Sequence, residues 1–355
     1  MKLRAPAVPV LPHATVEYTQ RYQDQHNGVL RLYFNQLNNA LTGLLGLDGG
    51  QYLEFPYGAF YDTTNQHDGA TTIPYAMRLN QTSYSNEVAV EPRNVVATAS
   101  ITTTTLTCTG VTSGRFYPGM ILSGTGVTAG TYVYLQLSST ETAVATHAFS
   151  SGGTVGQAKF VLDSVADVEV RQFVSGTGVP ANTRVVYVDT ATNEVTLNAN
   201  FTVQASGNYA FRPWGYKGTY SVSPSQTVSS TQISGVTDSK ITVTKSGLYN
   251  IQFSAQFANP GSSDYDVDVW LSVNDVDVPN SNTQVTIPKA HGTNGHMVAA
   301  WNWFQELNGG DYVEIRWRTE NSDVYIEYIG TQTAPIRPAV PSVIATVSFV
   351  STLPT

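Results

Sequence analysis

Charged residues are scarce in this chain of 355 residues, and their scarcity limits the partners it can bind. Asp, Glu, Lys and Arg together make up 12% of the sequence, where roughly 25% is usual in globular proteins. The 18 Lys and Arg residues are scattered, and the formal net charge is −8. Binding to phosphate groups requires clustered basic residues. We therefore expect neither nucleic acid nor an anionic membrane surface as a partner.

Cysteine and long apolar runs are also lacking. The single cysteine, Cys108, excludes an internal disulfide framework and a cysteine-rich zinc site, and we expect it in a strand, buried or half-buried. No segment approaches the roughly 20 apolar residues that span a bilayer. Residues 1–6 lack the apolar region of a signal peptide. We expect synthesis in a cytoplasm, no signal-peptide secretion and no cofactor.

The N-terminal part, residues 1–50, is predicted to be an arm followed by one α-helix. Pro6, Pro9 and Pro12 are spaced by three, which is typical of an extended arm. From residue 16 onward apolar residues recur at steps of three and four, as on one face of a helix. The residues of this face that we expect to attach the chain to a larger particle are Tyr22, Leu30, Tyr33, Phe34, Leu37 and Leu41.

After residue 51 every pattern favours β-strands, and one segment repeats itself. The sequence Ser-Gly-Thr-Gly-Val occurs at 123–127 and again at 175–179. Two copies of a small β-module are therefore predicted, at 94–160 and 161–216. The glycines of the first copy are not spaced as in a nucleotide-binding loop, and a strand rather than a helix follows them. We interpret them as turn residues.

Short alternating strands follow from residue 217 to 355 and predict a β-sandwich or jelly roll. Val313, Ile315 and Trp317 alternate with Glu314, Arg316 and Arg318, so one face of this strand is apolar and the other charged. The fold class is therefore mainly β. Asp264, Asp266 and Asp268 alternate in the same way, and three carboxylates on one face are weak candidates for calcium. His291 and His296 lack further ligands for zinc.

Several ordered motifs in this region resemble those of virion structural proteins of tailed bacteriophages. They are listed here as they stand: 245–256 (KSGLYNIQFSAQ), 278–281 (VPNS), 298–302 (VAAWN), 307–312 (LNGGDY) and 336–344 (IRPAVPSVI). The resemblance implies a C-terminal jelly roll like those of the tumour-necrosis-factor and C1q group, which assembles as a homotrimer. Residues 74–80 are similar to the first strand of such domains. The repeats at 94–216 would then interrupt one jelly roll formed by 51–93 and 217–355.

Aromatic residues are the candidates for the trimer interface that this resemblance implies. They are Trp301, Trp303, Tyr312, Trp317 and Tyr328. They offer more aromatic area than one sandwich interior usually needs. The alternative, that all of them lie in the core of a monomer, remains open at this point.

The expected function is that of a non-enzymatic protein on the virion surface, which decorates or cements the capsid. Its partners would be copies of itself and the major capsid protein or another virion protein. One alternative is a tail or head fibre that binds a host receptor or glycan. A polysaccharide depolymerase and a free-standing carbohydrate-binding module are further alternatives. No catalytic motif is found, and two repeats are too few for the long β-helix usual in phage depolymerases.

Overall fold

The computed structural model describes residues 9–11, 19–45, 55–67 and 73–353. These divide into two compact units, residues 1–56 and 57–355. In the first unit, α1 (Gln20–Leu45) begins after Thr19, whose hydroxyl accepts a hydrogen bond from the backbone N–H of Tyr22. Of the expected arm, only residues 9–11 are described, and they form neither helix nor strand. Among the described residues, no helix is long and apolar enough to cross a membrane.

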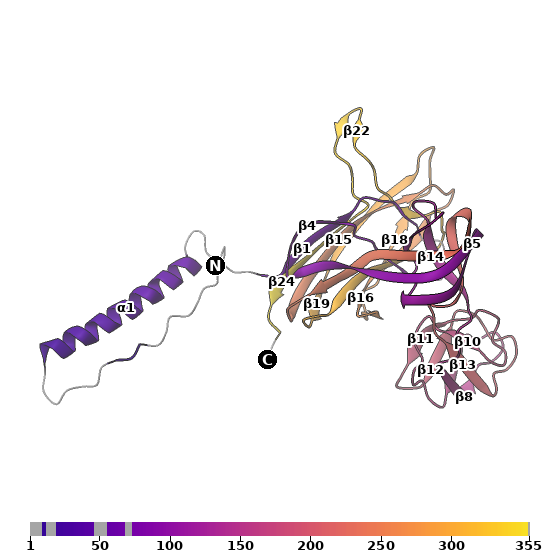
Figure 1. Cartoon of the computed structure of the whole chain (residues 1–355), viewed down its shortest axis with the longest axis horizontal. Helices are drawn as coiled ribbons and strands as arrows, with labels where there is room; N and C mark the ends of the chain where they lie inside the picture. Colours follow the sequence, from indigo (N-terminus) through magenta and orange to yellow (C-terminus); the bar gives the residue numbers. More distant parts are fainter. Residues whose placement is uncertain (1–8, 12–18, 46–54, 68–72, 354–355) are drawn as a thin grey trace. The chain divides into compact units, whose positions relative to one another are not determined.

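The second unit is built from antiparallel sheets, which confirms the prediction of a mainly β fold. The first sheet, called sheet A, contains β1 (Tyr57–Asp62), β2 (Gln66–His67), β15 (Gly247–Asn259), β19 (Gly295–Leu307), β21 (Tyr325–Ile326) and β24 (Val343–Ser351). The strand β4 (Gln81–Asn86) lies beside β1 (Figure 1). A separate hairpin pairs β22 (Gln332–Thr333) with β23 (Ile336–Arg337).

The second sheet, sheet B, faces sheet A across one hydrophobic core. Its strands are β3 (Tyr75–Ala76), β5 (Val88–Gly114), β6 (Ile121–Gly124), β7 (Tyr132–Ser139), β14 (Gly218–Val243), β16 (Tyr265–Val273), β17 (Val276–Asp277), β18 (Thr283–Ile287) and β20 (Tyr312–Thr319). The core joins Phe253 and Phe257 of β15 to Val269 of β16 and Ile315 of β20. Alternating side chains of both sheets therefore meet in one sandwich interior.

Two strands extend well beyond this sandwich. β5 and β14 pair in antiparallel register from Val88–Val243 to Cys108–Gly218 and run side by side in Figure 1. Their outer parts pack with β6 and β7 around a second core that includes Ile101 and Phe116. Cys108 is buried there in β5, as predicted. The expected domain boundary at 93/94 falls inside β5, because the strand continues without interruption from one core to the next.

The chain between β7 and β14 forms a third sheet with its own core. This sheet contains β8 (Ala145–Gly152), β9 (Lys159–Leu162), β10 (Phe173–Ser175), β11 (Val185–Asp189), β12 (Glu194–Leu197) and β13 (Asn208–Arg212). It appears as the smaller body in Figure 1, and we call residues 145–212 the small module. Its core includes Phe160, Phe201 and Tyr209. The expected boundary between the repeats, at 160/161, falls inside β9, because β8 and β9 pair with strands of the second copy.

The repeated Ser-Gly-Thr-Gly-Val segments nevertheless form the same turn. The N–H of Val127 donates to the carbonyl of Gly124, and the N–H of Val179 donates to that of Gly176. Gly126 and Gly178 have φ values of 80° and 81°. Positive φ at these positions favours glycine, which explains why the turn sequence is the best-preserved part of the repeat.

We expect the sandwich core to dominate the stability of the second unit. Replacing the buried Leu271 by Ala should lower the free energy of unfolding by about 2–5 kcal/mol, because it removes packed methyl groups and leaves a cavity. The exposed Leu137 provides the matched control, and Leu137→Ala should change the free energy of unfolding by less than about 1 kcal/mol. Urea denaturation followed by tryptophan fluorescence would measure both, and equal losses would contradict the assignment of the core.

Candidate functional site

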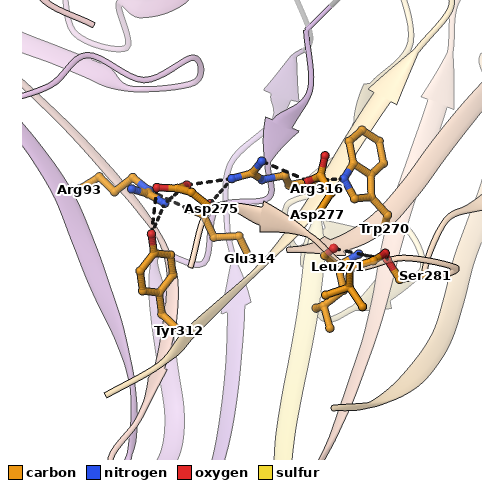
Figure 2. A network of polar contacts seen from close by, with 10 residues as sticks. Arg93, Trp270, Leu271, Asp275, Asp277, Ser281, Tyr312, Glu314 and Arg316 are labelled. Atoms are coloured by element: carbon orange, nitrogen blue, oxygen red, sulfur yellow. Dashed lines mark hydrogen bonds and ion pairs between the residues drawn. The ribbon is translucent and has the colours of Figure 1, made fainter. Parts of the chain in front are cut away.

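The charged face of sheet B carries a connected network of ion pairs (Figure 2). Arg93 of β5 donates from Nε to Glu314 Oε1 at 2.8 Å and from Nη2 to Asp275 Oδ1 at 2.6 Å. Arg316 of β20 donates to Asp275 at 2.8 Å and to Asp277 at 3.2 Å. Arg93 lies on the strand that leads toward the small module, so these contacts fix β5 against the β16–β20 part of the sheet.

Glu314 is the buried centre of this network. Its carboxylate accepts hydrogen bonds from Arg93, from Arg316 and from the hydroxyl of Ser239. Burial alone would raise the pKa of Glu314, but the hydrogen bond and charge of Arg93, aided by Arg316, outweigh it and lower the pKa to about 2. The side chain is therefore a permanent anion at neutral pH. It cannot serve as a proton donor.

A turn places the remaining carboxylates. Asn274 and Asp275 have φ values of 49° and 68°, which join β16 to β17 in a tight hairpin. Asp275 accepts a hydrogen bond from the hydroxyl of Tyr312 at 2.9 Å, and burial together with this carboxylate raises the pKa of Tyr312 to about 12. Asp277 accepts one from the indole N–H of Trp270 at 2.8 Å. The network thus holds Trp270 in place on the outer side of the sheet.

Beside this network lies a cavity of about 690 Å³ within the second unit. Three parts of the chain line it: sheet B with Trp270 and Arg318, the region of the second core with Tyr117 and Trp214, and the small module. We call it the cleft. The small module contributes Val170, Arg171, Phe173, Arg184, Val185, Val186 and Asn198. The volume is within the range of ligand-binding pockets, roughly 300–1,000 Å³.

The carboxylates in the cleft are paired with arginines. Asp268 lies 3.1 Å from Arg318, and Asp277 lies 3.2 Å from Arg316. Asp268 also accepts a hydrogen bond from the amide of Asn282. Both carboxylates are therefore already bound to side chains of the protein.

The calcium candidates do not gather around one point. Asp264 accepts a hydrogen bond from the backbone N–H of Lys289, Asp266 from the hydroxyl of Thr286, and Asp268 pairs with Arg318. No group of three or more His, Cys, Asp or Glu side chains that could hold a metal is found in the described part of the chain. His296 lies 3.3 Å from Glu327 instead.

The predicted interface residues lie in four different places. Trp317 is 1% exposed and packs against Tyr75 and Phe257 in the sandwich core, so its assignment to an interface is wrong. Tyr312 belongs to the network on sheet B, and Tyr328 is partly buried in the loop after β21. Trp301 and Trp303 are partly buried on β19, where both contact Phe253 at the rim of the core.

The outer face of sheet A is a second candidate site, which the sequence analysis missed. Paired residues of β1, β24, β15 and β19 form rows across this face. The rows are Tyr57–Ser348–Asn250–Phe304, Ala59–Thr346–Gln252–Asn302 and Tyr61–Ile344–Ser254–Ala300. Val298, paired with Gln256, extends the surface. No side chain in these rows is charged, and we call this surface the uncharged face.

Apolar side chains on the uncharged face are well exposed. Phe304 is 60% exposed and Val298 is 54% exposed. β19 also pairs with β15 along its whole length, while no strand of the described residues pairs with its other edge. Long free edges and contiguous apolar surface are features that proteins usually cover. The sequence signal for this face was the set of even-numbered residues in 295–307. They point away from the side of the strand that carries Trp301 and Trp303, because alternate residues of a strand point to opposite faces.

The helix residues predicted for attachment lie on α1. Phe34 and Leu41 are exposed, together with Leu32, which was not predicted. Tyr22, Leu30, Tyr33 and Leu37 are partly buried. Apolar side chains therefore remain exposed on α1, as they do on helices that pack against a partner.

No model of a known protein family matches the chain, and a search of curated proteins finds no match.

Glu314 provides a test of the network. Replacing it by Gln removes the charge at nearly constant shape, and should lower the free energy of unfolding at pH 7 by about 3–5 kcal/mol, because Arg93 and Arg316 lose a buried counter-charge. Glu306→Gln, on the exposed side of β19, should have little effect. Denaturant titrations of the three proteins would measure this difference.

The difference in the free energy of unfolding between the wild-type protein and Glu314→Gln is predicted to depend on pH. The pKa of Glu314 is lowered from 4.5 to about 2 in the folded protein. Its contribution is therefore complete above pH 4.5 and is lost as the pH falls from 4.5 toward 2, a loss of roughly 3 kcal/mol. The stability gap between the wild-type protein and Glu314→Gln should narrow over this range. A gap that stays constant would contradict the role given to Glu314.

Proposed function

We propose that this chain is a non-enzymatic structural protein of a tailed-bacteriophage particle, which assembles as a homotrimer on the particle surface. The observation that carries the proposal is the uncharged face of sheet A. The centres of stable interfaces are depleted of charged residues and contain exposed apolar and aromatic anchors. Phe304 and Val298 are such anchors among amide and hydroxyl side chains, which also pair readily across an interface.

The motifs in residues 245–344 support the same proposal, because they resemble trimeric jelly rolls of the tumour-necrosis-factor and C1q group. We propose that the sandwich is such a jelly roll. Its first strand would then be near residues 74–80. In the structure, Tyr75 and Ala76 pair with Trp317 and Arg316 of β20. The chain from 88 to 243, which includes β5, the small module and β14, would follow as one excursion from the jelly roll.

Attachment to the particle is assigned to α1 in this proposal. Leu32, Phe34 and Leu41 present apolar surface, and an isolated amphipathic helix gains stability chiefly from packing against something else. The major capsid protein or another virion protein would supply that surface. A role in decorating or cementing the capsid follows from this arrangement.

One alternative role has structural support. The cleft, with aromatic, amide and arginine side chains, favours a fibre that binds a glycan on the host. No comparable observation favours a depolymerase, since the carboxylates of the cleft are paired with arginines.

The assembly is testable with a matched pair of substitutions. Val298→Arg should dissociate the homotrimer into monomers, because three unpaired charges would be buried at the interface. Val203→Arg places the same charge at an exposed valine of the small module and should leave the trimer intact. Sedimentation equilibrium would measure the mass of each species. A wild-type protein that stays at 38.3 kDa at all concentrations would refute the proposal.

The role on the particle is tested by particles that lack the protein. We expect their heads to release DNA at a lower temperature or after a milder osmotic shock than complete particles. The measurement is dye access to the packaged DNA during heating. Heads of normal stability on particles that fail to adsorb to the host would contradict cementing and support the fibre.

A further inference from the structure

Two arginines of the cleft form no ion pair with a carboxylate of the described residues, and the first is Arg184. Its side chain is 8% exposed, and its guanidinium lies over the ring of Phe173, 4.8 Å from the centroid. The backbone of Arg184 bridges to Phe173, so both side chains stand on the same side of this pair of segments. The buried Nε of Arg184 has no hydrogen-bond acceptor. No carboxylate among the described residues lies within ion-pair distance of this guanidinium.

The second unpaired arginine is Arg171. Its backbone N–H donates to the carbonyl of Val185, which places it next to the segment that carries Arg184. Its guanidinium lies over the ring of Trp214, 4.9 Å from the centroid. No hydrogen bond or ion pair of this side chain is found with the described residues. The two unpaired cations therefore come from adjacent segments of the small module and line one cavity.

Both side chains are positively charged at neutral pH, although Arg184 is buried and Arg171 is partly buried. Loss of water lowers the pKa of Arg184 to about 10, and loss of water together with the charge of Arg316 lowers the pKa of Arg171 to about 10. A buried cation without a counter-charge is unfavourable. Binding of an anion would relieve this cost at Arg184, whereas Asp275 and Glu314 already favour the charge of Arg171. The cleft is thus electrostatically incomplete on the side of the small module.

The two other arginines that line the cleft, Arg316 and Arg318, each have a carboxylate. Arg93, Arg316 and Arg318 pair with Glu314, Asp277 and Asp268. Arg316 is 5% exposed and keeps one buried Nε without an acceptor. Among the arginines that line the cleft, those without an ion pair are therefore the two of the small module. The facing network of sheet B joins two arginines to three carboxylates, and two of these carboxylates, Asp275 and Glu314, act on the charge of Arg171.

The remaining lining of the cleft suits a sugar ring. Trp270 offers aromatic surface and is fixed by its hydrogen bond to Asp277. Asn280 and Asn282 supply amides at one rim. Flat aromatic rings pack against the C–H faces of sugars, and amides pair with hydroxyl groups. A small inorganic anion would use the arginines but leave this lining unoccupied.

We propose that the cleft binds an acidic saccharide, with the carboxylate of the sugar against Arg184 and Arg171 and its ring against Trp270. This inference does not depend on the homotrimer, because one chain supplies the whole cleft. Occupation by an acidic sugar would also link the small module to sheet B through the ligand.

Saturation-transfer NMR with the full chain tests the ligand class. The probes are D-glucuronate and N-acetylneuraminate, with D-glucose as the neutral counterpart of glucuronate. We expect both acids to bind with dissociation constants in the range of about 0.1–10 mM, and glucuronate to bind about tenfold more tightly than glucose. Failure of both acids to bind, or equal binding of glucuronate and glucose, would overturn the proposal. So would inorganic sulfate that displaces both acids at equal concentration, since the site would then recognise only an anion.

Substitutions locate the site and separate binding from folding. Arg171→Gln and Arg184→Gln should each weaken binding of glucuronate about tenfold, while Arg212→Gln, outside the cleft, should not change it. The thermal midpoint of Arg184→Gln without ligand should equal or exceed that of the wild-type protein, because an unpaired buried charge has been removed. Unchanged glucuronate binding in both variants, or a clear loss of stability in Arg184→Gln, would overturn the assignment of these arginines.

Discussion

The antiparallel pairing of β5 with β14 is the interaction on which the rest of the second unit depends. These strands begin and end in sheet B, where Val88 pairs with Val243, and their far ends carry a core of their own. The pairing brings the chain back beside its point of departure after the small module. Arg93 then fixes β5 through the buried Glu314, so the ribbon and the sandwich share one network. Without this pairing, residues from three parts of the sequence would not meet in a cleft.

The few charged residues matter through their positions on the two sheets of the second unit. Sheet B gathers carboxylates and arginines on its outer face, where Arg316 alone pairs with three carboxylates. The rows across sheet A contain none. Desolvating a surface costs least where no ion must lose its water. Sheet A is therefore suited to large contact with protein, whereas sheet B and the small module are suited to a polar ligand.

Strand periodicity made part of this structure predictable from the sequence, but it could not predict the rest. The alternation around Val313, Ile315 and Trp317 predicted the buried face of β20, and the repeated Ser-Gly-Thr-Gly-Val segments predicted two equivalent turns. The prediction that Trp317 lies at an interface was wrong. The aromatic residues were taken to exceed what one sandwich interior needs, whereas Trp317 fills that interior. Arg184 and Trp270 could not be related from the sequence. Their proximity depends on the register of β5 and β14 and on pairing between strands of the two repeats.

The two faces of one sandwich allow assembly and recognition to coexist. Sheets A and B meet through their inner faces, so the uncharged face and the charged face of sheet B point in opposite directions. Association through sheet A would leave the cleft of each copy open. If single acidic sugars bind weakly, three clefts on one proposed trimer, and many such trimers on one particle, would raise the effective affinity for a polymer without any new contact. A cementing protein with this geometry would also give the particle a weak, multivalent affinity for acidic polysaccharide, so the two roles need not exclude each other.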